Sequence, residues 1–576
     1  MDKKYMDKYN YWKTNKFFSE ETREELKSIE NDEKEIEDRF YKELEFGTAG
    51  LRGKIGAGTN RMNTYIISRA ANGLAEYIES KGKSYTERGV AIAYDCRHFS
   101  KEFAMTSALV LAAHNIKVYL FESLRPTPVL SFTVRHLNTA AGIVVTASHN
   151  PKIYNGFKVY WEDGAQILQE TADSITENIL KVKDFQDIKI MDEKEAFNKG
   201  LITYIGSEID NKYVEKVKSL SLRDNIDKKI NIVYTPLNGT GNILVRRVLK
   251  ERGFTNINVV PEQEHPDADF TTVPYPNPED SRAFEYAEKL GHKINAELLF
   301  ATDPDCDRLA IMVRNNDGKY IAFNGNQTGA ILVKYIIESM NELNILPSNG
   351  AIVKSIVTGD LGKAIASKYG VKTFETLTGF KNICGKEDDF ERTGENQFIF
   401  GYEESIGYVA GTFVRDKDAV ISSMLLCEAA AYYKKLGKNL NEVLEDIYKE
   451  YGYYKENLIS LVLEGIEGSN RIKRMMEGYR KDFPYEINGV KLKQYIDYKY
   501  SKITDIKSGN VSKCDIPVSN VLKFILEDGS WYAVRPSGTE PKIKLYMYSI
   551  GKDSSEAEEK LSVMKDIILG KLQSIK

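Results

Sequence analysis

The sequence contains no long hydrophobic run. Its most apolar stretch, residues 419–433, is short and interrupted by polar side chains, whereas a membrane-spanning helix needs about 20 consecutive apolar residues. The first residues, MDKKYMDKYN, are charged and lack the apolar core of a signal peptide. We therefore expect a protein that neither enters a membrane nor is exported.

Cysteine is scarce, and neither sign of charge dominates. The five cysteines are scattered without a CxxC pair, which argues against a disulfide framework and favours reduced thiols in the cytoplasm. The formal net charge of −4 comes without a block of basic residues, which argues against nucleic acid as a partner. No feature of the sequence indicates an obligate protein partner.

Three common active-site motifs are missing as well. The chain has neither the GxxxxGKS/T loop of many NTPases nor the GxGxxG loop of dinucleotide-binding domains. The GxSxG elbow of serine hydrolases is also absent. These absences weaken an assignment to any of the three classes.

A strand–helix–strand–helix–strand pattern, in contrast, recurs three times. Short apolar runs alternate with segments of helical spacing over residues 89–147, 230–302 and 350–400. Such alternation predicts open α/β sheets. Residues 521–572 predict a hairpin, a further strand and an amphipathic helix, and hence a smaller α+β domain.

A chain of 576 residues is too long for a single hydrophobic core. The first 45 residues predict a charged helical extension to the first domain. We place the boundaries of four domains at residues 1–208, 209–320, 321–455 and 456–576.

Each of the three repeats ends in a polar loop. The loops are TASHNP (146–151), DPDCDR (303–308) and GYEES (401–405), each after a predicted strand. Open α/β sheets bind ligands beyond the carboxyl ends of their strands. Any one loop could be an ordinary surface turn, but three equivalent loops rich in reactive side chains favour a site.

The DPDCDR loop predicts a metal site. In an extended segment Asp303, Asp305 and Asp307 would share one face and repel one another unless a cation neutralised them. Oxygen ligands suit a hard ion such as Mg²⁺ or Ca²⁺. An EF-hand is excluded because its glycine and glutamate positions hold Arg308 and Arg314. The alternative is a solvated acidic turn.

The TASHNP loop raises the question of what Ser148 does. If the chain is extended there, His149 points away from Ser148 and is poorly placed as its base. A serine near a metal could instead carry a phosphoryl group. Lys158, in YNGFK (154–158), is then a candidate for acid–base or charge-stabilising work. The alternatives are a loop serine and a surface lysine.

Three further segments contain groups that suit sugars or phosphates. RPSGTEPK (535–542) combines a guanidinium, hydroxyls and a glycine, as a phosphate site does. GYEES offers carboxylate acceptors for sugar hydroxyls. The glycine-dense segment 46–63, with Arg52 and Arg61, would let the backbone approach an anion. Each is equally compatible with an ordinary turn.

Taken together and in this order, these loops resemble those of the α-D-phosphohexomutase superfamily. With GTAGLRG (47–53) and GAGTNRMN (56–63), the resemblance runs from about Phe46 to about Tyr548. It is greatest to bacterial α-phosphoglucomutases and the phosphopentomutase-like branch. It implies three related α/β domains with mixed sheets and a smaller α+β C-terminal domain around a central cleft.

The resemblance also implies a role for individual residues. Ser148 would be the phosphoserine, and its phosphate would bind Mg²⁺ together with Asp303, Asp305 and Asp307. His149, Lys158, Arg52 and Arg308 would assist the transfer. The sugar would contact Thr378, Gly379, Phe380, Glu403, Ser405 and Lys417, and the non-reacting phosphate would contact Arg535, Ser537, Gly538 and Thr539. GYEES departs from the GEES or GEMS of many relatives, which leaves the sugar preference open.

The implied activity is that of a phosphoglucomutase. Glucose 1-phosphate and glucose 6-phosphate would interconvert through glucose 1,6-bisphosphate, which would also be the activator, so that sugar phosphates are the expected small-molecule partners. A phosphopentomutase, a phosphomannomutase or a hexose-bisphosphate synthase would use the same chemistry. The non-catalytic alternative is a sugar-phosphate-binding protein.

Overall fold

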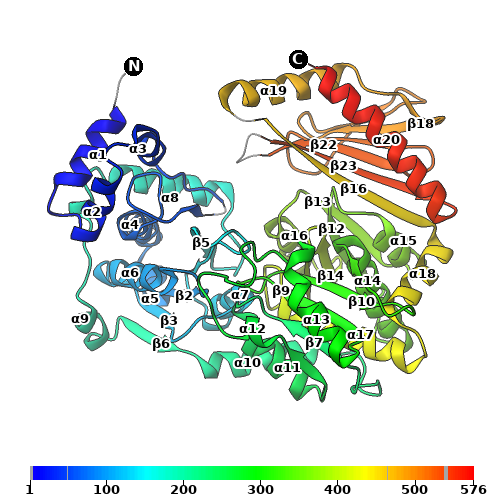
Figure 1. The fold of residues 1–576 in the computed structure, drawn as a ribbon, viewed down its shortest axis with the longest axis horizontal. Helices are drawn as coiled ribbons and strands as arrows, with labels where there is room; N and C mark the ends of the chain where they lie inside the picture. The colour runs from blue at the N-terminus through cyan, green and yellow to red at the C-terminus, as the bar shows by residue number, and fades with distance from the viewer. Residues whose placement is uncertain (1–3, 49, 464, 538–541, 576) are drawn as a thin grey trace. The chain divides into compact units, whose positions relative to one another are not determined.

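The computed structural model describes residues 4–48, 50–463, 465–537 and 542–575 (Figure 1). The chain divides into two compact units. The first contains residues 1–328 and 384–439, and the second contains residues 329–383 and 440–576. Among the helices within the described ranges, none combines the length and apolar character that crossing a membrane requires.

The first unit begins with three short helices followed by a mixed sheet. The sheet order is β1-β5-β4-β2-β3-β6, in which β4, β2, β3 and β6 run parallel, β5 is antiparallel to β4, and β1 is antiparallel to β5. The strands are β1 (Leu51–Lys54), β2 (Val90–Tyr94), β3 (Val118–Phe121), β4 (Ala141–Val145), β5 (Tyr154–Trp161) and β6 (Ile202–Ile205). Strands β2 and β4 are buried throughout, as short apolar runs in a parallel sheet should be.

Helices pack around this sheet and supply much of its core. Ile66, Leu74 and Leu111 pack with Ile92 and Ile143 of the strands. The helices are α1 (Lys4–Thr14), α2 (Glu20–Ser28), α3 (Glu33–Phe40), α4 (Thr64–Ser80), α5 (Lys83–Arg88), α6 (Ser100–Ala113), α7 (Thr127–Leu137), α8 (Gln169–Lys181), η1 (Phe185–Asp187) and α9 (Glu193–Asn198). The predicted helical extension is therefore confirmed. The glycine-dense segment 46–63 contains β1, a strand that the sequence did not predict.

A second mixed sheet of the first unit has the order β11-β10-β9-β7-β8. Its strands are β7 (Ile232–Thr235), β8 (Ile257–Val259), β9 (Leu298–Thr302), β10 (Leu309–Arg314) and β11 (Tyr320–Phe323). Its helices are α10 (Ser207–Ser219), α11 (Gly241–Glu251), α12 (Pro261–Glu264), η2 (Ser281–Phe284) and α13 (Glu285–Ile294). Asp280 caps the short 3₁₀ turn η2, which leads directly into α13.

The hairpin of β14 (Gln397–Glu403) and β15 (Gly407–Ala410), with α17 (Ala419–Lys435), completes the first unit. Helix α17 packs against α11 and β15. Helices α14 (Gly325–Glu342) and α16 (Phe380–Thr393) each continue from one unit into the other.

The second unit combines a parallel strand pair with an antiparallel sheet. The pair is β12 (Gly350–Ser355) with β13 (Lys372–Thr376), linked by α15 (Leu361–Lys368). The sheet order is β16-β23-β22-β21-β18-β19-β20. Its strands are β16 (Tyr453–Val462), β17 (Glu486–Ile487, paired with β18), β18 (Val490–Asp497), β19 (Lys502–Asp505), β20 (Val511–Lys513), β21 (Leu522–Leu526), β22 (Trp531–Pro536) and β23 (Lys542–Gly551).

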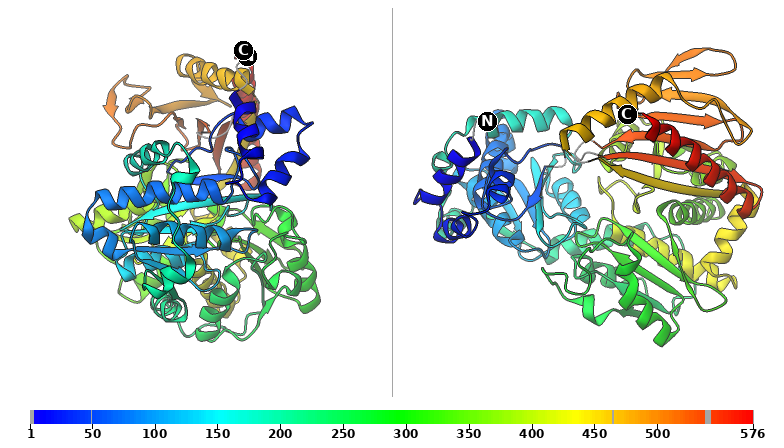
Figure 2. Two further views of the ribbon diagram at one scale, coloured as in Figure 1. Left: turned by 90° about the vertical axis from the view of Figure 1, so that its left-hand side faces the viewer. Right: turned by 45° about the horizontal axis from the view of Figure 1, so that its top comes forward.

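Three helices belong to this part of the second unit: α18 (Leu440–Tyr451), α19 (Gly465–Lys481) and α20 (Ser554–Ser574). Figure 2 shows the red helix α20 lying across one face of the orange sheet, where it packs on β23 and β16. Its buried residues Leu561, Met564 and Ile568 join a core with Leu545 and Met547 of β23. The predicted hairpin, strand and amphipathic helix of the C-terminal domain are thereby confirmed.

Candidate active site

Two of the predicted loops meet in the first unit. Ser148 follows β4 and Asp303 follows β9, 155 positions apart in the chain, yet the Ser148 hydroxyl donates a hydrogen bond to Asp303 Oδ2 at 2.8 Å. Ser148 is only 4% exposed and Asp303 is fully buried. The strand ends thus bring together the serine and the carboxylate that the sequence singled out.

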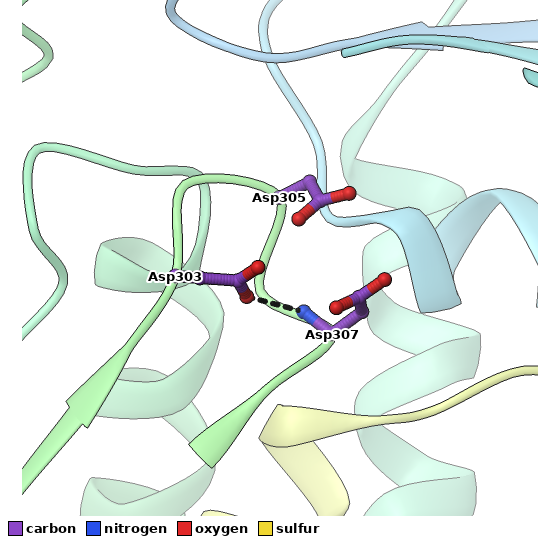
Figure 3. Close-up of side chains that lie close together, drawn as sticks. All are labelled: Asp303, Asp305 and Asp307. Atoms are coloured by element: carbon purple, nitrogen blue, oxygen red, sulfur yellow. Dashed lines mark hydrogen bonds between the residues drawn. The ribbon is translucent and has the colours of Figure 1, made fainter. Parts of the chain in front are cut away.

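The three carboxylates of the DPDCDR loop form one buried cluster. Figure 3 shows Asp303, Asp305 and Asp307 gathered on one side of a turn, and one oxygen of each lies within 4.8 Å of the others. The expected extended segment is wrong, because Cys306 has φ of +54° and its N–H bonds to the Asp303 carbonyl at 2.9 Å. The side chains converge through this turn and not through strand alternation.

The donor set fits a hard cation. Oδ1 of Asp305 and Oδ1 of Asp307 are buried and accept no hydrogen bond from any described residue. Burying such charge without a partner is costly, and carboxylate oxygens at this spacing are what Mg²⁺ or Ca²⁺ binds. Burial, together with the charges of Asp305 and Asp307, raises the pKa of Asp303 well above its usual range.

Two lysines lie against the cluster. Lys158 of β5 places Nζ 2.8 Å from Asp305 Oδ2 and 3.6 Å from Asp307 Oδ2. Lys417 places Nζ 3.1 Å from Asp307 Oδ2 and 3.1 Å from Asp416 Oδ1. Burial opposes ionisation of Lys417, but these carboxylates raise its pKa above the ordinary value. Lys417, predicted as a sugar contact, is therefore also a partner of the acidic cluster.

The geometry of His149 corrects the sequence interpretation. Ser148 has φ of +51°, so the chain is not extended there, and His149 Nδ1 lies 3.2 Å from the Ser148 hydroxyl. Burial lowers the pKa of His149 well below its usual value, and Arg308 and Arg52 add to the effect. A neutral imidazole within hydrogen-bond reach of Ser148 is able to take a proton there.

The arginines flank this arrangement at different distances. Nη1 of Arg308 lies 3.8 Å from Glu279 Oε2, and its Nε lies 3.9 Å from Asp307 Oδ1. Arg52 of β1 is exposed and donates to the Asn150 side chain at 3.3 Å. Arg61 is buried against α3, with Nη2 2.6 Å from Asp38 Oδ2, and so serves the fold.

Hydrogen bonds from several elements hold the DPDCDR loop, which we call the metal loop. Thr127, at the start of α7, donates its N–H to the Asp305 carbonyl at 2.9 Å and its hydroxyl to Asp305 Oδ2 at 3.1 Å. Thr240 donates its N–H to the Pro304 carbonyl at 2.8 Å. The sequence interpretation missed Thr127 and Glu279. The start of a helix at TPV was visible in the sequence, but its contact with Asp305 required the fold.

The GYEES loop is joined directly to the metal loop. Leu309 donates its N–H to the Ile406 carbonyl at 3.1 Å, next to a β-bridge between Arg308 and Gly407. Glu403, which ends β14, is 7% exposed. A side chain at Gly325 would place its Cβ 2.0 Å from the Glu404 carbonyl oxygen. The structure therefore brings Glu403 and Ser405 into the unit that holds Ser148.

The remaining predicted contacts fall in the second unit. Thr378 accepts a bond from the Asn382 side chain at 2.9 Å, Gly379 has φ of +107°, and Phe380 begins α16 and is buried. Arg535 pairs with Lys544 across β22 and β23, and the Ser537 N–H bonds to the Lys542 carbonyl at 2.8 Å. Gly538 and Thr539 lie outside the described residues. The contacts of all these residues with a sugar or a phosphate stay predictions.

Comparison with known proteins gives four matches in chain order. Residues 43–186, 211–318 and 324–451 match the phosphoglucomutase/phosphomannomutase alpha/beta/alpha domains I, II and III, and residues 484–564 match the C-terminal domain. A Staphylococcus aureus phosphoglucomutase is 40% identical over 543 residues, covering 94% of this chain and 96% of that protein. The same protein from another strain is 39% identical over the same length.

Two solved structures share the fold. Parafusin of Paramecium, an exocytosis-sensitive phosphoprotein and phosphoglucomutase, has a TM-score of 0.69 at 18% identity, covering 92% of this chain and 95% of that one. A phosphoglucomutase/phosphomannomutase family protein of Burkholderia thailandensis has a TM-score of 0.65 at 18% identity, covering 92% and 98%. The four domain matches and the 40% identity over nearly the whole chain show that the chain belongs to the phosphoglucomutase/phosphomannomutase family of the α-D-phosphohexomutase superfamily.

Proposed function

We propose that this enzyme interconverts glucose 1-phosphate and glucose 6-phosphate through a phosphorylated Ser148 and glucose 1,6-bisphosphate. The observation that carries the proposal is the 2.8 Å contact between the Ser148 hydroxyl and a buried triad of carboxylates. A serine so placed suits phosphoryl transfer. The relatives named phosphoglucomutase, at 40% identity over nearly the whole chain, support glucose phosphates as the substrates.

The reaction consists of two phosphoryl transfers. In the first, the free hydroxyl of the sugar phosphate attacks the phosphorus on Ser148, its new O–P bond forms, and the bond from phosphorus to Ser148 Oγ breaks. The hydroxyl proton passes to a base, for which neutral His149 is the nearest imidazole. The bisphosphate then reorients, and its other phosphoryl group is transferred to Ser148. Free bisphosphate, acting as the activator, would charge an unphosphorylated chain by the same transfer.

The charged side chains prepare the site for these transfers. Lys158 and Lys417 lie beside the carboxylates, where they would also balance the charge of a phosphoryl group. A Mg²⁺ ion held by Asp303, Asp305 and Asp307 would neutralise phosphoryl oxygens when bound. Arg52 and Arg308 would contact the phosphoryl group from the sides.

Sugar and distal phosphate contacts are proposed from the resemblance of the loops. Glu403 would accept hydrogen bonds from the sugar hydroxyls, and Ser405 would accept or donate them. Lys417 would reach the sugar from the side of the metal site. Further sugar contacts would come from Thr378, Gly379 and Phe380. The non-reacting phosphate would be held by Arg535, Ser537, Gly538 and Thr539.

We also propose the domain boundaries 1–208, 209–320, 321–455 and 456–576. In support, each of the four matched segments falls within one proposed domain. Sugar phosphates are the proposed partners. A cytoplasmic location is proposed because all five cysteines are free thiols.

The test is the Ser148→Ala variant, assayed with Mg²⁺ and glucose 1,6-bisphosphate. We expect turnover of glucose 1-phosphate to fall by at least about a thousandfold, because the phosphoryl carrier is lost. Ser107→Ala is the matched control, since Ser107 is equally buried but donates only to the Phe103 carbonyl within α6. Wild-type turnover by Ser148→Ala would disprove the mechanism. Comparing glucose, mannose and pentose phosphates would decide the substrate.

A further inference from the structure

Ser148 adopts a backbone conformation that its surroundings must enforce. Its φ of +51° lies in the left-handed region, which non-glycine residues rarely occupy. Strain of this kind persists only where neighbouring groups fix it, and it gathers at functional sites. In this loop the amide and the carbonyl of Ser148 are both held, and both connections lead to Asp95.

The amide is held through Thr146. Ser148 donates its N–H to the Thr146 hydroxyl oxygen at 2.8 Å, and that hydroxyl donates to Asp95 Oδ2 at 2.6 Å. Asp95 Oδ1 accepts from the Ser100 hydroxyl at 2.6 Å and from the Arg97 N–H at 2.9 Å. Asp95 therefore accepts three hydrogen bonds, and these fix the Thr146 hydroxyl that binds the amide of Ser148.

The carbonyl is held by Arg97. One guanidinium nitrogen, Nη2, donates to the carbonyls of Ser148 at 2.6 Å and Asn150 at 2.5 Å. The other, Nη1, donates to the carbonyls of Pro151 at 3.0 Å and Tyr154 at 3.2 Å. Nε lies 3.2 Å from Asp95 Oδ2, and the two side chains are fully buried. A single guanidinium thus fixes the whole turn after Ser148.

Phe270 packs against Arg97 from a segment outside the sheets. Its ring is fully buried and lies 4.9 Å from the Arg97 guanidinium carbon, within the range of a cation–π contact. Phe270 belongs to the segment that follows α12, outside the sheet that contributes Ser148. Its ring fills a side of the guanidinium that forms none of the hydrogen bonds above.

We propose that Asp95 and Arg97 are positioning residues that hold Ser148 Oγ against Asp303 during phosphoryl transfer, an inference that rests on the proposed phosphoserine. We call the side chains of Asp95 and Arg97 and the contacts they make the clamp. If the clamp were removed, Ser148 would relax toward φ below zero and its hydroxyl would turn away from the carboxylates. Both transfers use the same oxygen, so both would slow. Sugar binding does not involve the clamp, so the loss falls on kcat and not on KM.

The experiment compares Arg97→Ala with Arg125→Ala. Arg125 is a matched control, because it too is nearly buried, pairs with Asp210 at 2.9 Å and lies 5.5 Å from the ring of Phe121. Among the described residues, its side chain bonds none of the carbonyls after Ser148. We expect Arg97→Ala to lower kcat about 100-fold with KM within about threefold, and Arg125→Ala to keep kcat within about twofold at a similar loss of Tm.

Chemical rescue separates positioning from simple support of the fold. Added methylguanidinium should restore kcat of Arg97→Ala by at least about tenfold and leave Arg125→Ala unchanged. Arg97→Lys should lie between, because one ammonium cannot bond four carbonyls. If Arg97→Ala fails to fold, Thr146→Val supplies the same test: it keeps the shape of the side chain, removes the hydroxyl link, and should lower kcat about tenfold.

Phosphate labelling tells a failed clamp from a failed mechanism. Intact mass after incubation with glucose 1,6-bisphosphate should show one added phosphate on Ser148 in the wild type. Its absence there would overturn the phosphoserine itself. If the wild type is labelled and Arg97→Ala keeps wild-type kcat, or loses no more than Arg125→Ala, the positioning role is wrong. A loss confined to KM would overturn it equally.

Discussion

Two buried clusters of charged side chains, one in each unit, differ in whether their charges are balanced. In the first unit, four carboxylates lie together, those of Asp303, Asp305, Asp307 and Asp416. Among the described residues three cations lie within ion-pair distance of them: Lys158, Lys417 and Arg308. Two carboxylate oxygens are left without a hydrogen bond from a described residue. That cluster is arranged to bind a cation.

The cluster of the second unit is balanced in charge, although Asp360 Oδ1 also accepts no hydrogen bond from a described residue. Lys354 Nζ lies 3.1 Å from Asp360 Oδ1 and 3.2 Å from Glu375 Oε1, and it donates to the Thr358 carbonyl at 2.8 Å. Lys523 Nζ lies 3.5 Å from Glu375 Oε2. Two lysines thus face two carboxylates, and no formal charge is left over.

Aromatic and backbone groups complete that balanced cluster. Lys523 donates to the Ile356 carbonyl at 2.8 Å and lies 4.2 Å from the ring centre of Trp531, whose Nε1 donates to Asp360 Oδ2 at 2.9 Å. Burial opposes ionisation of Asp360, yet Lys354 and Lys523 hold its pKa below the usual value. The difference teaches that buried charge alone does not mark a site. The unpaired excess of one sign does.

The strongest test of this contrast is Asp303→Asn. Because its environment raises the pKa of Asp303, the ionised form destabilises the metal-free fold at neutral pH. We expect the variant to lose about a thousandfold in kcat while its metal-free free energy of unfolding rises by about 1 kcal/mol. Denaturant unfolding in chelator measures the second effect. A loss of stability would show that the triad is a structural cluster like the other.

Asp360→Asn should have the opposite effect on stability. Removing one partner of a buried ion pair leaves the other uncompensated, at a cost of about 3–5 kcal/mol in the free energy of unfolding. The control is Asp482→Asn in the same unit, where an exposed carboxylate pairs with Lys571 and should change stability by less than about 1 kcal/mol. Equal effects of the two substitutions on the urea midpoint would contradict the balanced cluster.

The pH dependence of stability sharpens the same point. Asp360 and Glu375 have pKa values below the ordinary range, each with Lys354 as the first opposing influence on the effect of burial. Their contribution is therefore full above the carboxylate pKa of the unfolded chain, about 4, and is lost as pH falls toward the folded values. We expect the wild type to lose stability more steeply between pH 5 and pH 3 than Asp360→Asn. Parallel curves would refute this origin.

The close approach of the Glu404 carbonyl to Gly325, the first residue of α14, offers a smaller effect. A methyl group there would meet the Glu404 carbonyl, so Gly325→Ala should displace the GYEES loop while leaving both charge clusters in place. We expect KM for the sugar phosphate to rise about tenfold with kcat reduced less. Steady-state kinetics measures this, and Gly385→Ala is the control because a Cβ at Gly385 meets nothing within 4 Å. An unchanged KM would remove GYEES from the sugar site.

Local pattern predicted most of the elements, because period and composition decide them. The three repeated units, the C-terminal hairpin and helix, and the DPDCDR and TASHNP loops lie where the sequence placed them. GYEES was predicted as a loop, but its first three residues, 401–403, continue strand β14. Strand β1 was missed, since a four-residue strand in a glycine-dense run has no apolar alternation and is defined by its pairing with β5.

The sequence could not supply the conformation within the loops. His149 was misplaced because the left-handed backbone of Ser148 depends on Asp95 and Arg97, about fifty positions earlier. Asp303, Asp305 and Asp307 were correctly grouped, but on the assumption of an extended chain. The structure has a turn at Cys306 instead. In both loops the residue types predicted the chemistry, and contacts distant in sequence decided the geometry.

The smallest expected effect concerns the edge of the acidic cluster. Glu279 is 40% exposed in its side chain and lies 3.8 Å from Arg308, so its attraction is largely screened by water. Glu279→Gln should lower kcat by about threefold or less, and the loss should become smaller in high salt, which screens an exposed pair. Glu279→Lys should lower kcat more, because a like charge would push Arg308 from the site. If Glu279→Gln cost as much as Asp303→Asn, Glu279 would have to be counted among the charges that define the site.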